Sequence, residues 1–195
     1  FGAALTYGAT GATNYNEIAL AVSSGSILSH VYLSLGIGLL IIGFAFKVAL
    51  VPFHLWSPDV YQGAPTLITG FLCTAPKVAG FGALIKLFVT AFPEVYHNWE
   101  NLFWILAALT MTVGNISALV QVNVKRMLAF SSVSHAGYLV LGVLVYNWVG
   151  ISAVLFYLIV YSVMNFGAFY IISLVEKENS GLTFRDYRGL AKDHP

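Results

Sequence analysis

Charged side chains are scarce in this chain. They make up 9% of its 195 residues, whereas a soluble globular domain carries about 25%. Hydrophobic residues make up 58%, and the mean hydropathy is +0.81. An ordinary soluble domain is therefore excluded, and the composition predicts a protein that crosses a membrane several times.

Cysteine is almost absent too. The one cysteine, Cys73, lies in an apolar run, and a single thiol supports neither a disulfide framework nor a metal site. The net charge is +1 without a basic patch, which argues against a nucleic-acid surface. The sequence lacks a glycine-rich nucleotide loop, a nucleophile elbow and a cysteine–histidine cluster with ligand spacing. We therefore expect no cofactor, metal or nucleic-acid partner for this chain.

An initiator methionine and a signal-peptide pattern are missing as well. The chain opens in an apolar stretch typical of the end of a hydrophobic helix. It closes in a charged stretch typical of the middle of a loop. We expect a fragment of a longer protein, with residues 1–195 forming one transmembrane domain.

Apolar runs divide the chain into spans, since about 20 apolar residues cross a bilayer. After a helix tail over residues 1–7, the runs predict spans at 27–56, 65–92, 102–122, 127–146 and 151–175. A short helix is expected near residues 17–22. The Ser-Pro-Asp and Gly-Ala-Pro signals place a turn at residues 57–64, and residues 176–195 read as a charged loop. The fold class is an all-α membrane protein, a polytopic helix bundle with about five full spans.

Lysine and arginine are missing from the loops on one side of these spans, at residues 8–26, 93–101 and 147–150. Cationic residues accumulate on the cytoplasmic side of membrane proteins. The opposite side is therefore predicted to be cytoplasmic, or its matrix or stromal equivalent. It carries six cationic residues: Lys125, Arg126, Lys177, Arg185, Arg188 and Lys192.

Two groups of residues are expected at the membrane interfaces. Lys125 and Arg126 are predicted to anchor a helix end at the lipid headgroups. On the other side we expect an aromatic belt made of Tyr96, Trp99, Phe103, Trp104, Tyr146 and Trp148.

The longest predicted span contains both a charge and a helix breaker. Lys47 lies in an apolar run, and Pro52 follows five residues later. An ammonium at the centre of a span costs about 2.5–3.5 kcal/mol, and proline removes a backbone donor and breaks the helix. A broken helix at membrane depth is tolerated where protein or a water-filled cavity satisfies the freed backbone groups. Charge and break together predict an ion pathway near Pro52.

Lys77 is the second lysine inside a span. It follows Pro76 about a dozen residues into the next helix, which places it near mid-membrane at a rise of about 1.5 Å per residue. Because the two helices are antiparallel neighbours, Lys47 and Lys77 are expected to face each other across a cavity and to exchange protons. The alternative is that one lysine pairs with an unseen carboxylate or reaches the interface. Lys86 lies near the outer end of the same helix, and its side chain is expected to extend to the membrane interface.

Two histidines are further candidates. His54 follows the break, where its imidazole could relay protons or bond the carbonyls freed around Pro52. His135 lies in the fourth span after a serine-rich turn, which could carry a hydrogen-bonded water chain or simply allow close helix packing. The remaining histidines lie at span ends or in loops and are expected to be solvated: His30, His97 and His194.

Four stretches resemble one known family in order. The segment Lys47-Val-Ala-Leu-Val-Pro-Phe-His-Leu-Trp-Ser-Pro-Asp-Val-Tyr-Gln-Gly-Ala-Pro65 resembles the signature of the antiporter-like membrane subunits of respiratory complex I. The Pro76-Lys77 helix, residues 124–138 and residues 161–169 match the same family. The form Val-Pro-Phe-His-Leu-Trp is similar to N-type subunits, whereas L- and M-type subunits and cation/proton antiporter subunits usually show Phe-Pro-Leu-His.

The resemblance implies a fourteen-helix antiporter-like fold with inverted repeats, each containing a broken helix. This chain would run from the end of the sixth helix to the loop before the twelfth. The family's glutamate on the fifth helix and lysine on the twelfth would lie outside residues 1–195. The implied function is proton translocation within NADH:quinone oxidoreductase, coupled to quinone reduction elsewhere. Lys47 and Lys77 would move protons, with His135 and His54 as possible relays.

The resemblance also implies the surroundings of the chain. It would hold no redox centre, because other subunits bind NADH, FMN, iron–sulfur clusters and quinone. Its partners would be the other membrane-arm subunits and the lipid bilayer. The expected location is the bacterial inner (plasma) membrane, with the thylakoid or mitochondrial inner membrane as alternatives.

Two other interpretations remain. One is a subunit of a Mrp-type cation/proton antiporter or of a membrane-bound hydrogenase, against which the Val-Pro-Phe-His form argues. The other is a membrane anchor that has lost transport. Lysines at mid-membrane argue against an anchor, because apolar residues would be more stable there.

Overall fold

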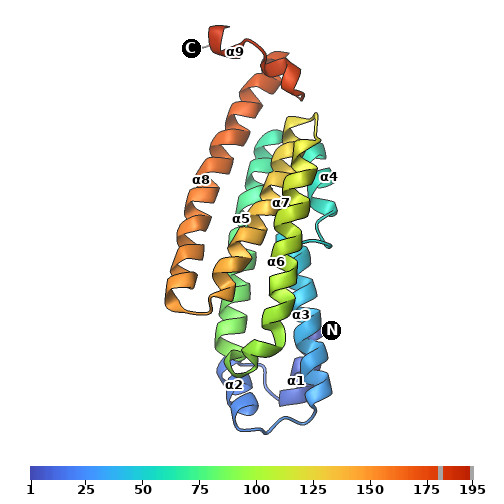
Figure 1. Cartoon of the computed structure of the whole chain (residues 1–195), viewed down its shortest axis with the longest axis vertical. Coiled ribbons are helices and arrows are strands. Elements are labelled where there is room, and N and C mark those ends of the chain that lie inside the picture. Colours follow the sequence, from blue (N-terminus) through green and yellow to red (C-terminus); the bar gives the residue numbers. More distant parts are fainter. Residues whose placement is uncertain (180–181, 194–195) are drawn as a thin grey trace.

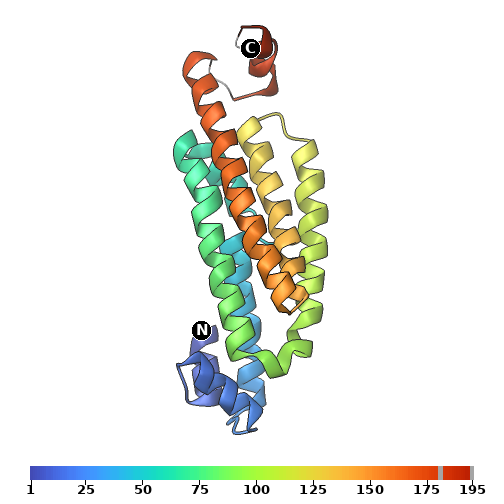
Figure 2. The same cartoon turned by 90° about the vertical axis from the view of Figure 1, so that its left-hand side faces the viewer.

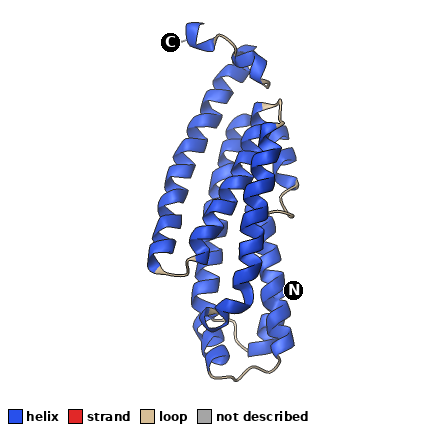
Figure 3. Ribbon diagram, viewed as in Figure 1, coloured by secondary structure: helices blue, strands red, loops and turns tan. Residues whose placement is uncertain are grey.

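The computed structural model describes residues 1–179 and 182–193. Within these ranges the regular structure is helical, and the one β contact is an isolated bridge between Asn123 and Thr183 (Figure 3). Five helices are long and apolar enough to cross a membrane: α3 (His30–Val48), α5 (Thr66–Ala91), α6 (Tyr96–Leu119), α7 (Val124–Leu144) and α8 (Trp148–Asn179). The predicted fold class, an all-α polytopic bundle, is confirmed.

The helices run up and down along one long axis (Figure 1). Helices α1 (Gly2–Thr10) and α2 (Tyr15–Ser23) lie at one end, here called the α2 end, where α1 packs against α3 and α2 packs against α5. The short elements η2 (Phe184–Tyr187) and α9 (Leu190–Asp193) lie at the opposite end, here called the α9 end. In Figure 2, α6 and α7 lie side by side, while α8 crosses over α5 and α7.

Several predicted boundaries change. The turn expected at residues 57–64 is wrong, because this segment forms the helix α4 (Trp56–Gly63) with Pro58 in its first turn. Proline is tolerated there because the first N–H groups of a helix have no intrahelical partner. Helix α6 begins before residue 102, after the short η1 (Pro93–Val95), and α8 continues beyond residue 175. The short helix expected near residues 17–22 is confirmed as α2. Of the charged segment 176–195, residues 180, 181, 194 and 195, His194 among them, lie outside the described residues.

The broken helix near Pro52 is confirmed, but α3 already ends at Val48. Ala49 adopts a left-handed conformation with φ 60° and ψ 48°. Its N–H donates to the Phe46 carbonyl at 3.2 Å, and the Leu50 N–H donates to the Ala45 carbonyl at 2.8 Å. This pair of bonds is a Schellman motif, which satisfies the last carbonyls of a helix.

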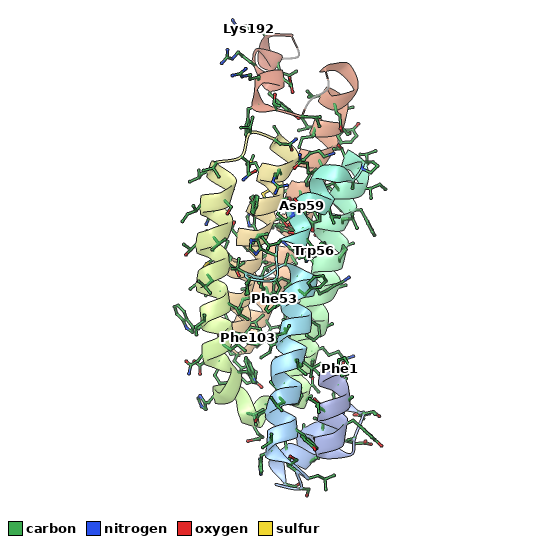
Figure 4. All side chains as sticks on the ribbon, turned by 90° about the vertical axis from the view of Figure 1, so that its right-hand side faces the viewer. Phe1, Phe53, Trp56, Asp59, Phe103 and Lys192 are labelled. Carbon is green, nitrogen blue, oxygen red and sulfur yellow. The ribbon has the colours of Figure 1, made fainter. Side chains whose placement is uncertain are left out.

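Side chains complete the hydrogen bonding of the break. The Trp56 Nε1–H donates to the Phe46 carbonyl at 2.9 Å, and the Val51 N–H donates to Oγ1 of Thr110 on α6, also at 2.9 Å. Figure 4 shows Phe53, Trp56 and Asp59 following one another along this part of the chain. Protein groups therefore satisfy the interrupted backbone, as an apolar environment requires.

The predicted aromatic belt is only partly right. Trp104 and Trp148 are 55% and 77% exposed, as a belt requires, but Trp99 and Phe103 are each 1% exposed. These two rings pack edge-to-face against Phe88 of α5, with centroids 5.1 Å and 5.3 Å away. The burial of an aromatic residue depends on the helix face that carries it, which its distance from the span end does not reveal.

Candidate functional site

Lys77 lies inside the bundle, where α5, α7 and α8 meet. It is 3% exposed. Its Nζ donates to Ser132 Oγ on α7 at 2.5 Å and to the Ser132 carbonyl, and it lies 5.5 Å from the ring centroid of Tyr161 on α8. Among the residues that the structure describes, no carboxylate forms an ion pair with it. The ammonium is therefore held by neutral oxygen atoms and a ring face, which compensate its charge only partly.

Tyr161 connects the three helices around this lysine. Its hydroxyl donates to Ser132 Oγ at 2.8 Å and lies 3.0 Å from Sγ of Cys73 on α5. Its own carbonyl accepts a hydrogen bond from Nδ2 of Asn165 at 2.9 Å. Cys73 and Lys77 are four residues apart on one helix, so they lie on the same face. Sequence reasoning missed Cys73 and Tyr161 as parts of the site, although the four-residue spacing on α5 was a usable signal.

His135 extends this cluster by one turn of α7. Its Nδ1 lies 2.5 Å from the Tyr157 hydroxyl, and its ring centroid is 5.3 Å from that of Tyr161. The structure therefore brings Lys77 and His135 into one polar group, linked through Ser132 and Tyr161. Whether protons follow this route stays a prediction.

His54 lies apart from this cluster, in the break between α3 and α4. It is 6% exposed and packs edge-on against Phe130, with ring centroids 6.3 Å apart. The backbone of Pro52 interacts with the imidazole, while Nδ1 has no hydrogen-bond partner of normal geometry in the described part of the chain. Both predicted roles of His54, as a proton relay and as a partner of the carbonyls around Pro52, stay predictions.

Lys47 has different surroundings. Its side chain is exposed, in the last turn of α3, whereas Ala45 and Val48 on either side are each 1% exposed and face the core. A Cβ atom placed on Gly80 of α5 would lie 3.6 Å from the Lys47 Cγ, so the lysine stem runs beside that helix. The prediction that Lys47 and Lys77 face each other across a cavity is wrong for this chain. The inward positions of α3 are taken by its apolar neighbours, and Lys77 points to α7.

A second buried lysine lies at the α9 end. Lys125 is 3% exposed, so its predicted place at the lipid headgroups is wrong. Its Nζ donates to the Ala64 carbonyl at 2.9 Å and to Thr66 Oγ1 at 3.2 Å, and it lies 3.8 Å from Oε1 of Glu176 on α8. It closes the C-terminus of α4, where carbonyls lack helical partners. Residues far apart in the chain meet here, which no local pattern indicates.

Arg126 also holds α4 in place, but at the surface. Its Nη1 donates to Asp59 Oδ1 at 2.6 Å and to Gln62 Oε1 at 3.0 Å. The Asp59 side chain is 71% exposed, so this ion pair contributes at most about 1 kcal/mol.

Comparison with known proteins identifies the family and the fold. The whole chain, residues 1–195, matches the profile described as NADH:quinone oxidoreductase/Mrp antiporter, TM. The chain belongs to this family. NADH-quinone oxidoreductase subunit N of Trichlorobacter lovleyi is 49% identical over 197 residues, which cover 100% of this chain and 40% of the relative. The chain thus spans about two fifths of the length of that curated relative.

Solved structures agree with this assignment. Respiratory complex I from Thermus thermophilus with bound aureothin contains a chain that is 40% identical, with a TM-score of 0.70 over 88% of this chain and 35% of that one. The membrane-bound sulfane sulfur reductase, an archaeal respiratory membrane complex, contains a chain that is 29% identical. Its TM-score is 0.86 over 95% of this chain and 38% of that one. The chain has the fold of an antiporter-like membrane subunit.

Proposed function

We propose that this chain is the central part of a proton-translocating membrane-arm subunit of an NADH:quinone oxidoreductase, of the N type. One observation carries the proposal: Lys77 is buried within a helix long and apolar enough to cross a membrane, and it is bound by Ser132 and Tyr161 rather than by a described carboxylate. Ionisable residues inside spans are costly and usually mark ion pathways. A merely structural ammonium would gain stability from an anionic partner.

The residues present suggest the order of the steps. Lys77 holds a proton on Nζ and releases it through Ser132 and Tyr161 toward His135, whose Nδ1 faces the Tyr157 hydroxyl. Lys47, exposed on this chain, exchanges charge with a carboxylate supplied from outside residues 1–195. His54 acts as a second relay at the helix break.

The chain acts as a non-redox translocase in this proposal. NADH, FMN, iron–sulfur clusters and quinone are bound by other subunits, and quinone reduction there drives the movement of protons here. The partners are the other membrane-arm subunits and the lipid bilayer, and the location is a bacterial inner membrane with the α9 end toward the cytoplasm. The number of cationic residues at that end supports this orientation.

A second candidate is a subunit of a Mrp-type cation/proton antiporter or of a membrane-bound hydrogenase. It is supported by the family description, which includes Mrp antiporters, and by the likeness to an archaeal respiratory complex. The two candidates differ in what drives proton movement. Proton uptake that follows electron transfer from NADH to quinone supports the first, and uptake driven by a sodium gradient alone supports the second.

The experiment measures proton pumping by the intact complex in sealed vesicles. In the Lys77→Ala variant we expect normal assembly, with steep losses of both pumping and coupled turnover. Lys86→Ala is the matched control, because Lys86 lies on the same helix with an exposed side chain. Wild-type pumping in the assembled Lys77→Ala complex would overturn the proposal.

A further inference from the structure

We infer that Glu176, Thr66 and Lys125 form a proton-accepting site at the α9 end, from which protons reach Lys77. This inference rests on the proposed function. It assigns to that function an entry site made by the first turn of α5, the start of α7 and the end of α8.

A cavity opens onto this site. Its volume is about 260 Å³, and it is lined by Pro65, Thr66, Leu67, Ser173 and Glu176. A water molecule takes up about 30 Å³ of the liquid, so the space holds several. The Glu176 side chain is 33% exposed, whereas the partners of its carboxylate, Thr66 and Lys125, are buried. The carboxylate is thus open to the cavity on one side and tied to the bundle on the other.

The contacts divide the two carboxylate oxygens between two partners. Oε2 accepts a hydrogen bond from the Thr66 hydroxyl, and Oε1 lies 3.8 Å from the Lys125 ammonium. The Lys125 side chain is 4% exposed, and a buried charge needs both a counter-charge and hydrogen bonds. It has both, since the Ala64 carbonyl and Thr66 Oγ1 also accept from it. The lysine therefore holds its position while the carboxylate exchanges protons with the cavity.

Polar groups continue from this site toward Lys77 along one face of α5. The residues Thr66, Thr69, Cys73 and Lys77 are each at most 4% exposed. They follow one another at intervals of three and four residues, which places them on a single helix face. Thr69 Oγ1 lies 3.3 Å from the Ala64 carbonyl that Lys125 also binds, and it donates to the Tyr61 carbonyl at 3.0 Å. This face of α5 therefore carries polar side chains from Thr66 to Lys77, and Thr69 connects it to α4.

Tyr61 of α4 bridges the middle of this route. It is 2% exposed, its hydroxyl donates to the Leu72 carbonyl at 3.1 Å, and it packs in one cluster with Cys73 and Tyr161 of the Lys77 site. The side chains packed around it are apolar: Val124, Ala129, Phe169 and Ile172. Tyr61 thus connects the outer cluster with the Lys77 cluster.

Two described titratable groups face Glu176. Lys125 approaches from α7, and Tyr187 interacts with it from η2. From α5 the facing residue is Thr66, which does not titrate. Glu176 is therefore the acidic member of the site, and its removal leaves Lys125 without a counter-charge.

The test uses the intact complex in sealed vesicles with Glu176→Gln. Glutamine keeps the size and can still accept from Thr66, but it cannot bind a proton on its side-chain oxygen. Collection of protons matters most when they are scarce, so coupled turnover should fall about tenfold at alkaline pH on the α9 side and little at acidic pH. This is less than the roughly 10²–10⁴-fold effect of a general acid or base, because water replaces part of the relay. Glu176→Asp should restore most of the rate.

The outcomes separate this inference from the proposed function. The matched control is Glu100→Gln, at the α2 end. Its coupled turnover should equal that of wild type at every pH. Wild-type turnover of Glu176→Gln at alkaline pH would overturn the inference, as would a loss that is equal at all pH values. Proton pumping at the wild-type rate by the Lys77→Ala complex would instead overturn the proposed function. If Glu176→Gln does not assemble, the Tyr61→Phe variant provides the test. Wild-type coupled turnover of that variant at alkaline pH would also overturn the entry route.

Discussion

Lys77 is bound in a way that suits reversible loss of its proton. Ser132 offers its hydroxyl and carbonyl oxygens, and Tyr161 offers a ring face. These groups stabilise the ammonium, yet none becomes an unpaired buried charge when the amine is neutral. A buried carboxylate in their place would hold the proton far more tightly, since breaking a buried ion pair costs about 3–5 kcal/mol. The neutral partners therefore support the proposal that Lys77 carries a proton.

Replacing Ser132 by alanine tests this arrangement. The change removes the hydroxyl that accepts from both Lys77 and Tyr161. A hydrogen bond to a charged group contributes about 1.5–3 kcal/mol, so we expect a stability loss of that order. The measurement is the thermal unfolding midpoint of the detergent-solubilised complex.

A double variant, Ser132→Ala with Lys77→Met, shows whether the loss of stability comes from the contact with the lysine. With Lys77→Met as background, Ser132→Ala should cost clearly less, because the ammonium that needed the hydroxyl is gone. Coupling energies between contacting residues are typically about 0.5–3 kcal/mol. Additive effects of the two changes would contradict the contact.

At the scale of elements, the break between α3 and α4 is held by the neighbouring helix α6. The buried Thr110 is the link: its Oγ1 accepts from the Val51 N–H and donates to the Leu106 carbonyl at 2.5 Å. A single side chain thus fixes the position of the break relative to α6.

Thr110→Val should loosen that link. Valine has a similar shape but leaves the Val51 N–H without a partner, which costs about 1–3 kcal/mol for a buried donor. Thr112→Val is the matched control, because Thr112 lies on the same helix, is exposed and, within the described part of the chain, donates only to the Ala108 carbonyl of its own helix. The expected result is a lower unfolding midpoint for Thr110→Val alone; equal shifts would show that the bond to Val51 does not matter.

The close packing of α6 and α7 sets the position of Ser132 and His135. A Cβ atom on Gly114 of α6 would lie 2.7 Å from the Ser134 backbone nitrogen of α7, so a larger residue there must push the helices apart.

Gly114→Ala is therefore expected to destabilise the subunit by about 1–3 kcal/mol and to reduce coupled turnover. On α5, Gly82→Ala provides the control, since nothing lies within 4 Å of the added atom and alanine favours a helix by about 0.5–1 kcal/mol. Both variants are compared by unfolding midpoint and by the amount of assembled complex. An unchanged unfolding midpoint and an unchanged amount of assembled complex in Gly114→Ala would contradict the close contact between α6 and α7.

At the scale of the whole molecule, charge and topology agree. The segments that carry Lys125, Arg126 and the cationic residues after α8 lie together at the α9 end (Figure 1). Lys192 marks that end in Figure 4, and Phe1 lies toward the other.

Labelling in whole cells tests the orientation. The native Cys73 is buried and should not react, so new cysteines report their own side, in a full-length subunit cleared of other cysteines. A membrane-impermeant maleimide should label Ser24→Cys, in the exposed loop after α2, in intact cells. Arg185→Cys, which is exposed at the α9 end, should react only after the membrane is opened. The reverse pattern would contradict the assigned orientation.

Much of this protein is determined by the sequence alone. Hydropathy, breakers and charge asymmetry act over short stretches, so they predicted the five spans, the broken helix near Pro52 and the buried position of Lys77. Predicted boundaries were wrong where one sequence signal is compatible with two structures. At Pro58, Ser-Pro-Asp was interpreted as a turn, but the same residues also suit the first turn of a helix.

Only the tertiary structure decided which side chains meet. Lys77 and Ser132 are 55 residues apart, and Thr66 and Glu176 are 110 apart. Such contacts depend on the rotation of each helix about its axis and on its neighbours, and the long helices here carry apolar residues on nearly every face. Because that pattern gives no direction toward the core, packing alone exposes Lys47 and encloses Lys77 and Lys125.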